Sequence, residues 1–207
     1  MHPNPIFRQA ATQQNLGFAR DRGFGVLSIN GALGPLMAHI PFLLNANGDQ
    51  ADLHLVRSNS IVRALAEPQL AVIIISGPDS YVSPDWYGVA DQVPTWNYVA
   101  VHLRGRLELL PDDDMRDLLD RQSAHFEDQL IPKTPWKTAK MTPGVRDRLM
   151  RQILPARLTV TAVDGTWKLG QNKPDEVRHR AARQVQTCAI GTDTALLAAL
   201  MLAPPKA

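Results

Sequence analysis

The chain has 207 residues, of which 44% are hydrophobic and 20% charged, and its net charge is +2 at pH 7. This length fits one domain, or one domain with an appended helical piece, and so small a net charge gives no broad basic face for nucleic acid. The single cysteine, Cys188, excludes an intramolecular disulfide and a multi-cysteine metal site. We expect no signal peptide and, because the longest apolar run near an end (194–203) is about half of a membrane span, a soluble cytoplasmic protein.

Strand patterns joined by tight turns fill the first half of the chain. In chain order we expect a helix at 13–22 after an N-cap at Thr12, strands at 24–31, 35–48 and 51–58, a short helix at 59–67, and strands at 70–77 and 97–110. Asn30-Gly31 is a strong two-residue hairpin signal. Hairpin-linked strands with hardly a helix between them predict a mainly β, α+β fold, in which an antiparallel sheet closes fully or partly into a barrel with flanking helices.

The second half has a helical character. Its expected elements are a helix with an acidic start at 111–130, a proline-rich connector at 131–144, a helix at 145–154, a strand at 156–170 that turns at Asp164-Gly165, and a polar helix at 174–186. No boundary separates two independent cores. We therefore expect one domain over 1–187, with a helical insert at about 111–154, followed by a C-terminal tail at 188–207.

Signatures of the common catalytic machineries are absent from the sequence, including the nucleophile elbow, the P-loop and the zinc-protease helix motif. Three histidines, His39, His54 and His102, lie in predicted strands and would converge on a metal if those strands were neighbours. The alternative is that they occupy separate half-buried positions, and they lack carboxylate or cysteine company. We expect no metal site and name no catalytic residue.

The segment "HLVRSNS" at 54–60 has two interpretations. Arg57 ends a strand, Ser58 and Asn59 follow, and a helix begins near Ser60. A guanidinium, a hydroxyl and free backbone amides at such a point suit a phosphate group. In the alternative interpretation, Ser58 or Asn59 caps the helix and Arg57 is a solvated charge.

Two further segments indicate either a flat ligand or a subunit interface. Pro41 lies inside the strand segment "AHIPF" (38–42), where a missing amide hydrogen implies a sheet edge or a bulge. Aromatic residues gather in an expected loop at 76–88 and in the segment "VPTWNY" at 93–98. Tyr and Trp are enriched both around planar ligands and at interfaces, so the two interpretations are compatible.

These segments resemble the PaiB-type proteins, a family of FMN-binding split barrels also described as negative transcriptional regulators. The resemblance covers nearly the whole chain and depends on six motifs: "GFGVLS" at 23–28, "AHIPF" at 38–42, "HLVRSN" at 54–59, "GPDSYVSPDWY" at 77–87, "VPTWNYVAVHLRG" at 93–105 and "WKLGQNK" at 167–173. Two positions depart from the family pattern. The phosphate segment continues without the usual proline and aromatic residue, and Gly170 replaces a serine.

The resemblance implies an antiparallel, Greek-key-like split β-barrel that forms a homodimer with FMN bound at the interface. The residues that it assigns to FMN binding are Ala38, His39, Pro41, Arg57, Ser58, Asn59, Trp96, Asn97, Tyr98, Lys168 and Gln171. The phosphate would lie at 57–59, the flavin ring along 38–41, and residues 96–98 would close the site. Lys168 and Gln171 would approach the polar edge of the ring.

Three classes of function follow from these observations. The first is an FMN-binding protein with a redox or flavin-sensing role, which as an enzyme would be an FMN-dependent oxidoreductase. The second is a transcriptional regulator that acts through DNA or a partner protein, although the sequence contains no helix-turn-helix and its best basic segment is "VRHRAARQ" at 177–184. The third is a flavin-free binding or scaffold protein.

Overall fold

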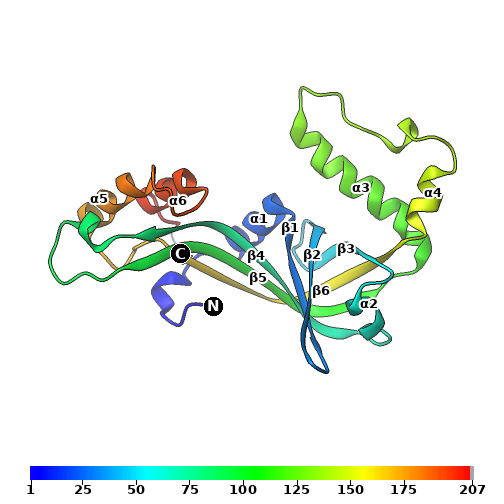
Figure 1. Cartoon of the computed structure of the whole chain (residues 1–207), viewed down its shortest axis with the longest axis horizontal. Helices are drawn as coiled ribbons and strands as arrows, with labels where there is room; N and C mark the ends of the chain where they lie inside the picture. The colour runs from blue at the N-terminus through cyan, green and yellow to red at the C-terminus, as the bar shows by residue number, and fades with distance from the viewer. Residues whose placement is uncertain (206–207) are drawn as a thin grey trace. The chain divides into compact units, whose positions relative to one another are not determined.

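A computed structural model describes residues 1–205 of the chain (Figure 1). Its strands, in chain order, are β1 (Phe24–Gly31), β2 (Gly34–Leu44), β3 (Gln50–Val56), β4 (Gln69–Val82), β5 (Thr95–Leu109), β6 (Ile153–Lys168) and β7 (Gly191–Thr192). Its α-helices are α1 (Thr12–Arg22), α2 (Ser60–Ala64), α3 (Met115–Glu127), α4 (Val145–Met150), α5 (Asp175–Val185) and α6 (Thr194–Leu202). Short 3-10 helices, η1 (Pro5–Phe7), η2 (Pro84–Tyr87), η3 (Asp112–Asp114), η4 (Asp128–Leu130) and η5 (Thr138–Lys140), lie between them.

The strands form one sheet in the order β1-β2-β3-β6-β5-β4-β7, and β1 also pairs with β4. This additional pairing returns the order to its start, so that β1 to β6 form a closed ring and β7 is added to the other edge of β4. Closure removes unpaired strand edges from the ring. The predicted fold class, a mainly antiparallel split barrel with flanking helices, is confirmed.

The chain divides into two compact units, which are described separately. Unit 1 contains residues 1–18, 74–102 and the chain from 163 onward, and unit 2 contains 19–73 and 103–162. The strands β4, β5 and β6 contribute residues to both units.

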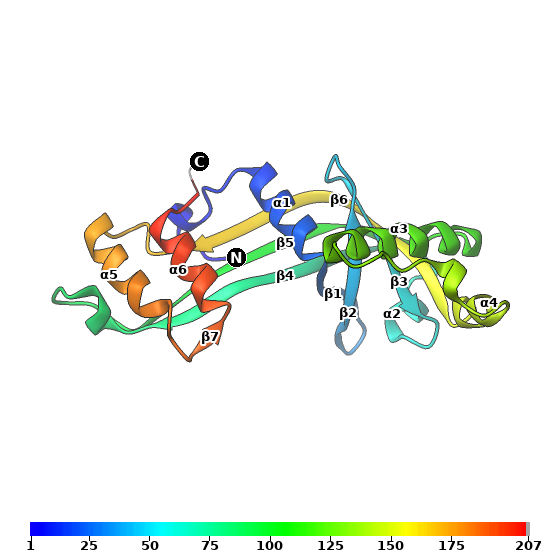
Figure 2. The same cartoon turned by 90° about the horizontal axis from the view of Figure 1, so that it is seen from above.

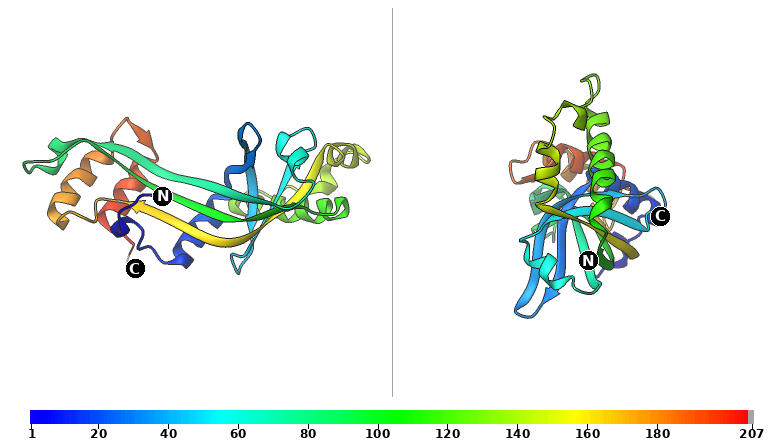
Figure 3. Two further views of the ribbon diagram at one scale, coloured as in Figure 1. Left: turned by 90° about the horizontal axis from the view of Figure 1, so that it is seen from below. Right: turned by 90° about the vertical axis from the view of Figure 1, so that its right-hand side faces the viewer.

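In unit 2, β1 and β2 form a hairpin (Figure 3), but its two-residue turn is Ala32-Leu33 and not the expected Asn30-Gly31, which belongs to β1 and pairs with β2. Their register is regular from Phe24 opposite Pro41 to Gly31 opposite Gly34. Buried residues alternate along β1, as in a strand with one face toward a core, whereas β3 buries the three successive residues 51–53. The side chains of Phe42, Leu53 and Leu158 are completely buried.

A charged group lies beneath α3 in unit 2. Asp52 of β3 is buried, and its carboxylate accepts hydrogen bonds from Arg157 of β6 at 2.6 and 3.0 Å and from Arg121 of α3 at 3.0 Å. Burial by itself raises the pKa of Asp52, but the two arginines lower it by more than burial raises it, so the pKa of Asp52 lies below its usual range. The ion pairs thus join two strands and the covering helix.

Two expected boundaries in unit 2 differ from the structure. The helix expected at 145–154 ends at Met150, because β6 begins at Ile153 and pairs with β3. The helix expected at 59–67 is shortened to Ser60–Ala64. Pairing with a distant strand decided the first boundary, which local helix signals do not report.

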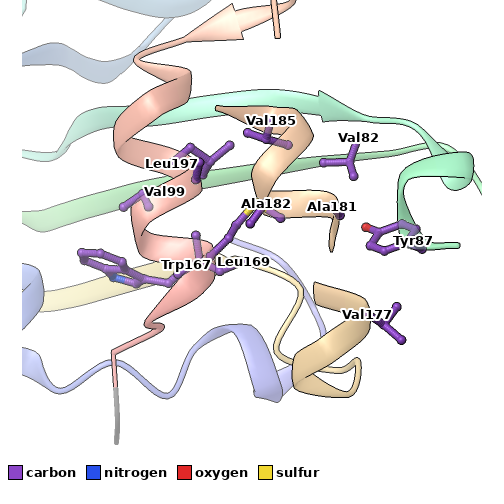
Figure 4. Close-up of a cluster of buried hydrophobic side chains, with 12 residues drawn as sticks. Val82, Tyr87, Val99, Trp167, Leu169, Val177, Ala181, Ala182, Val185 and Leu197 are labelled. Atoms are coloured by element: carbon purple, nitrogen blue, oxygen red, sulfur yellow. The ribbon is translucent and has the colours of Figure 1, made fainter. Parts of the chain in front are cut away.

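Unit 1 has its own hydrophobic core, in which α5 and α6 lie side by side (Figures 2 and 4). The buried side chains of this core are Val82, Tyr87, Val99, Trp167, Leu169, Val177, Ala181, Ala182, Val185, Leu197, Ala198 and Met201. Three of these belong to α6, so the segment expected as a tail contributes folded structure to unit 1. The buried guanidinium of Arg178 donates from Nε to the carbonyl oxygen of Met201 at 2.7 Å and fastens α5 to the end of α6.

Two strands run further through unit 1 than the sequence predicts. The loop expected at 76–88 is strand as far as Val82, followed by η2. The turn expected at Asp164-Gly165 is wrong, since β6 continues through it to Lys168. A Cβ at Gly165 would lie 2.1 Å from Oδ1 of Asn15, so this glycine admits a side chain of α1 against the strand.

Candidate functional site

The turn after β3 combines a helix cap with two basic side chains. Asn59 is the N-cap of α2, because its Oδ1 accepts a hydrogen bond from the amide of Ile61 at 2.9 Å. The capping interpretation is therefore right for this residue. Arg63 donates from Nη1 to the carbonyl oxygen of Ser58 at 3.1 Å, and within the described residues the Ser58 hydroxyl makes no hydrogen bond.

Arg57 is turned toward the start of the helical segment that follows β5. Its Nη2 donates to Oδ2 of Asp112 at 2.6 Å, and its Nε donates to the carbonyl oxygen of Arg151 at 2.8 Å. The Arg57 and Asp112 side chains are 45% and 64% exposed, so the pair is weak and exchanges easily with another anion. Two guanidinium groups and a free hydroxyl at one turn are a donor set that fits a phosphate, provided that Arg57 leaves Asp112.

The β2 segment presents an open edge rather than a bulge. Its register with β1 is unbroken through Pro41, so the bulge interpretation is wrong. Pairing with β3 begins only at Phe42, which leaves the other edge of the preceding residues outside that ladder. Within the segment, Ala38 is half-buried, whereas His39 is exposed and its ring stacks on Phe24 with centroids 6.3 Å apart.

The segment at 96–98 does not act as one group, because successive strand residues point to opposite faces. Asn97 is buried, whereas Trp96 is exposed and Tyr98 is half-buried on the other face of β5. The indole Nε1 of Trp96 donates to Oδ1 of Asp79 at 2.9 Å. The Trp96 ring lies 6.3 Å from Tyr81, edge to face, and Tyr81 meets Trp86 in the same way.

Asn97 and Lys168 line one pocket of about 320 Å³ in unit 1. The Lys168 ammonium donates to Oγ1 of Thr95, and burial together with the nearby charge of Lys173 lowers its pKa. Gln171 has a different role. Its Oε1 accepts from the amide of Leu169 at 2.8 Å and its Nε2 donates to the carbonyl of Trp167, so it closes its own turn.

Lys173 and Tyr87 were not among the residues expected to bind a ligand. The ammonium of Lys173 lies 4.3 Å from the centre of the Tyr87 ring, and both residues line the pocket. The only signal in the sequence was that Lys173 ends the motif "WKLGQNK". A spacing of five residues along an irregular turn does not indicate that two lysines share a pocket.

Within 1–205, no three His, Cys, Asp or Glu side chains gather as a metal site would require. Over the same residues, no helix has the length and apolarity needed to cross a membrane.

The expected flavin residues therefore fall into two groups. Ala38, His39, Pro41, Arg57, Ser58 and Asn59 belong to unit 2, and Trp96, Asn97, Tyr98, Lys168 and Gln171 belong to unit 1. A closed strand ring with a phosphate-suited turn after β3 places the protein in the class of split-barrel flavoproteins.

Comparisons with known proteins identify the family within that class. Residues 1–162 match the family described as "Putative FMN-binding domain". The chain is 24% identical over 188 residues to "Protease synthase and sporulation protein PAI 2" of Bacillus subtilis, which covers 90% of this chain and 89% of that protein. Since the family match extends over most of the chain, the protein belongs to this PaiB-type FMN-binding family, and FMN is the cofactor that this membership assigns to it.

Two solved structures have a similar fold. The FAD and heme binding protein of Mycobacterium smegmatis is 20% identical, with a TM-score of 0.60 over 83% of this chain and 78% of that one. The flavocytochrome Anf3 of Azotobacter vinelandii is 17% identical, with a TM-score of 0.62 over 93% of this chain and 81% of that one. At these identities the likeness concerns the fold.

Proposed function

We propose that this protein binds FMN as a homodimer, with the flavin at the subunit interface, and that it serves a redox or flavin-sensing role. The observation that carries the proposal is the family match over 1–162, which includes the β2 edge and the whole turn after β3. Bound FMN would supply hydride and electron chemistry through its ring, and the protein would supply position and electrostatics.

The phosphate of FMN would bind at the turn after β3. The Arg57 guanidinium would exchange Asp112 for two phosphate oxygens, and the Ser58 hydroxyl would donate to a third. Asn59 would act indirectly, because its side chain caps α2 and so fixes the backbone of the turn. The flavin ring would lie along the open β2 edge at 38–41.

The outer face of the β1–β2 hairpin is suited to a second copy of the chain. Phe24 and Met37 on this face are 50% and 64% exposed, and His39 lies between them. Exposed apolar side chains gathered on one sheet face are typical of an interaction surface. Exposed Trp96 and half-buried Tyr98 offer aromatic rings that a dimer seam or a flavin would cover, as the family resemblance implies.

Direct contact with DNA through α5 has little support, because two of its three arginines are used within unit 1. Arg178 is buried and bonded to Met201, and Nε of Arg180 donates to the carbonyl oxygen of Tyr87 at 2.9 Å. A regulatory role would then depend on the bound flavin or on a partner protein.

The test of this proposal is Met37→Asp, which places a charge on the hairpin face. We expect the wild type to elute as a dimer by light scattering, and the variant to be monomeric and to bind FMN at least ten times more weakly. Leu149→Asp is the matched control, because Leu149 is 47% exposed on α4. A monomeric wild type that binds FMN tightly would refute a flavin site at a subunit interface. A Met37→Asp variant that remains dimeric would show that the interface does not include the hairpin face.

A further inference from the structure

The pocket in unit 1 contains two lysines, and the printed hydrogen-bond acceptor of each is a neutral group. Lys168 donates to the Thr95 hydroxyl and Lys173 donates to Oε1 of Gln92, and both acceptors are neutral. Asp91 is the one carboxylate that lines the pocket, and no hydrogen bond or ion pair joins it to either lysine within residues 1–205. The pocket lining therefore carries two positive charges and one negative charge.

Two positive charges near each other in a half-buried place are unfavourable in the absence of an anion. The consequence is visible at Lys168, whose pKa is lowered first by burial and then by the charge of Lys173. A carboxylate or phosphate oxygen between the two ammonium groups would remove both penalties. Asn97 lines the same pocket, and its Nδ2 donates to Sδ of Met201 at 3.5 Å.

Tyr87 provides a second and independent observation. Its side chain is 1% exposed and lines the pocket, yet its hydroxyl has no hydrogen-bond partner among the described residues. Burying a hydroxyl without a partner costs about 1–3 kcal/mol, so such groups in folded proteins usually indicate a missing partner. The ring of Tyr87 meets the pocket, since the ammonium of Lys173 lies 4.3 Å from its centre.

We propose that this pocket binds the carboxylate or phosphate group of a small molecule other than FMN, held between Lys168 and Lys173. A volume of about 320 Å³ suits a small metabolite. Both lysines lie beyond residue 162, where the match to the FMN-binding family ends. This assignment replaces the flavin-edge role that the resemblance implies for Lys168, and it does not depend on the proposed FMN site.

The test is a calorimetric titration in which inorganic phosphate or succinate is added to the full-length protein. Each titration is carried out once without FMN and once in the presence of FMN. We expect at least one probe to bind, and Lys168→Met and Lys173→Met each to weaken that binding at least tenfold. Lys140→Met is the control, because Lys140 is an exposed lysine of η5 in unit 2. FMN affinity should stay within twofold in Lys173→Met and Lys140→Met.

Three results would overturn the inference. They are a wild type that binds neither probe, lysine variants that bind the probe as the wild type does, and displacement of the probe by FMN. A fall in FMN affinity on Lys168→Met would return this lysine to the flavin site. Lys173→Arg guards against a folding artefact, because it retains the charge and should restore most of the probe binding.

Discussion

Arg57→Ala is expected to weaken FMN binding by about 2- to 100-fold. A hydrogen bond to a charged group contributes about 1.5–3 kcal/mol, whereas the exposed pair between Arg57 and Asp112, which must break first, is worth about 0.2–1 kcal/mol. The difference leaves about 0.5–2.8 kcal/mol, and about 1.4 kcal/mol is a factor of ten in affinity. Asp112→Asn removes the competing carboxylate and should tighten binding by up to about fivefold.

The assay is a fluorescence titration of FMN against each variant, with the dimer checked by light scattering. Arg148→Ala is the matched control, since Arg148 is an exposed arginine of α4. The gain from Asp112→Asn should vanish in the double variant with Arg57→Ala, because the carboxylate acts only through that arginine. If Arg57→Ala leaves the FMN affinity within twofold of the wild type, the phosphate assignment is wrong.

Two further predictions concern the stability of each unit, and a third concerns one hydrogen bond in unit 1. Asp52→Asn should lower the free energy of unfolding by about 1–3 kcal/mol at pH 7. Because the pKa of Asp52 is depressed in the fold, its contribution is present above the unfolded pKa near 4 and lost as the pH falls through the folded value, so urea titrations of wild type and variant should converge in acid. Leu197→Ala should lower the free energy of unfolding by about 2–5 kcal/mol, whereas the control Leu196→Ala, at an exposed neighbouring residue, should lower it by less than about 0.5 kcal/mol. Equal losses of stability in thermal melts would refute the packing of α6. Gly165→Ala should break the hydrogen bond of 2.8 Å that Oδ1 of Asn15 accepts from the indole Nε1 of Trp167. An unchanged tryptophan emission would contradict that contact.

The sequence predicts the strands of the barrel well because their signals are local. The hairpin of β1 and β2 forms where a turn was expected to within two residues, with the turn at Ala32-Leu33 instead of Asn30-Gly31. The alternation of apolar residues along β3 and β5 sets which face is buried. Closure into a barrel followed from tight hairpins with few helices between them. The phosphate-suited turn was also visible, because a strand end, an arginine and a helix cap are adjacent in sequence.

The remaining features depend on contacts between distant residues. β6 passes through Asp164-Gly165 because the missing side chain admits Asn15, which lies far away in the chain. The adjacent residues Trp96, Asn97 and Tyr98 do not share one face of β5, because the pleat of the strand places Asn97 on the face opposite to the other two. The partner that Arg57 holds, Asp112, was equally invisible to local patterns.

The most direct measurement is an absorbance spectrum of the purified full-length protein, recorded before and after incubation with excess FMN and removal of free flavin by gel filtration. We predict that the two flavin bands co-elute with the protein at a ratio of one FMN per chain. A protein that stays colourless after incubation and elutes free of flavin would contradict the account. The aromatic side chains of Tyr81, Trp86 and Trp96 in unit 1 and the outer face of the β1–β2 hairpin in unit 2 would then be protein interfaces alone.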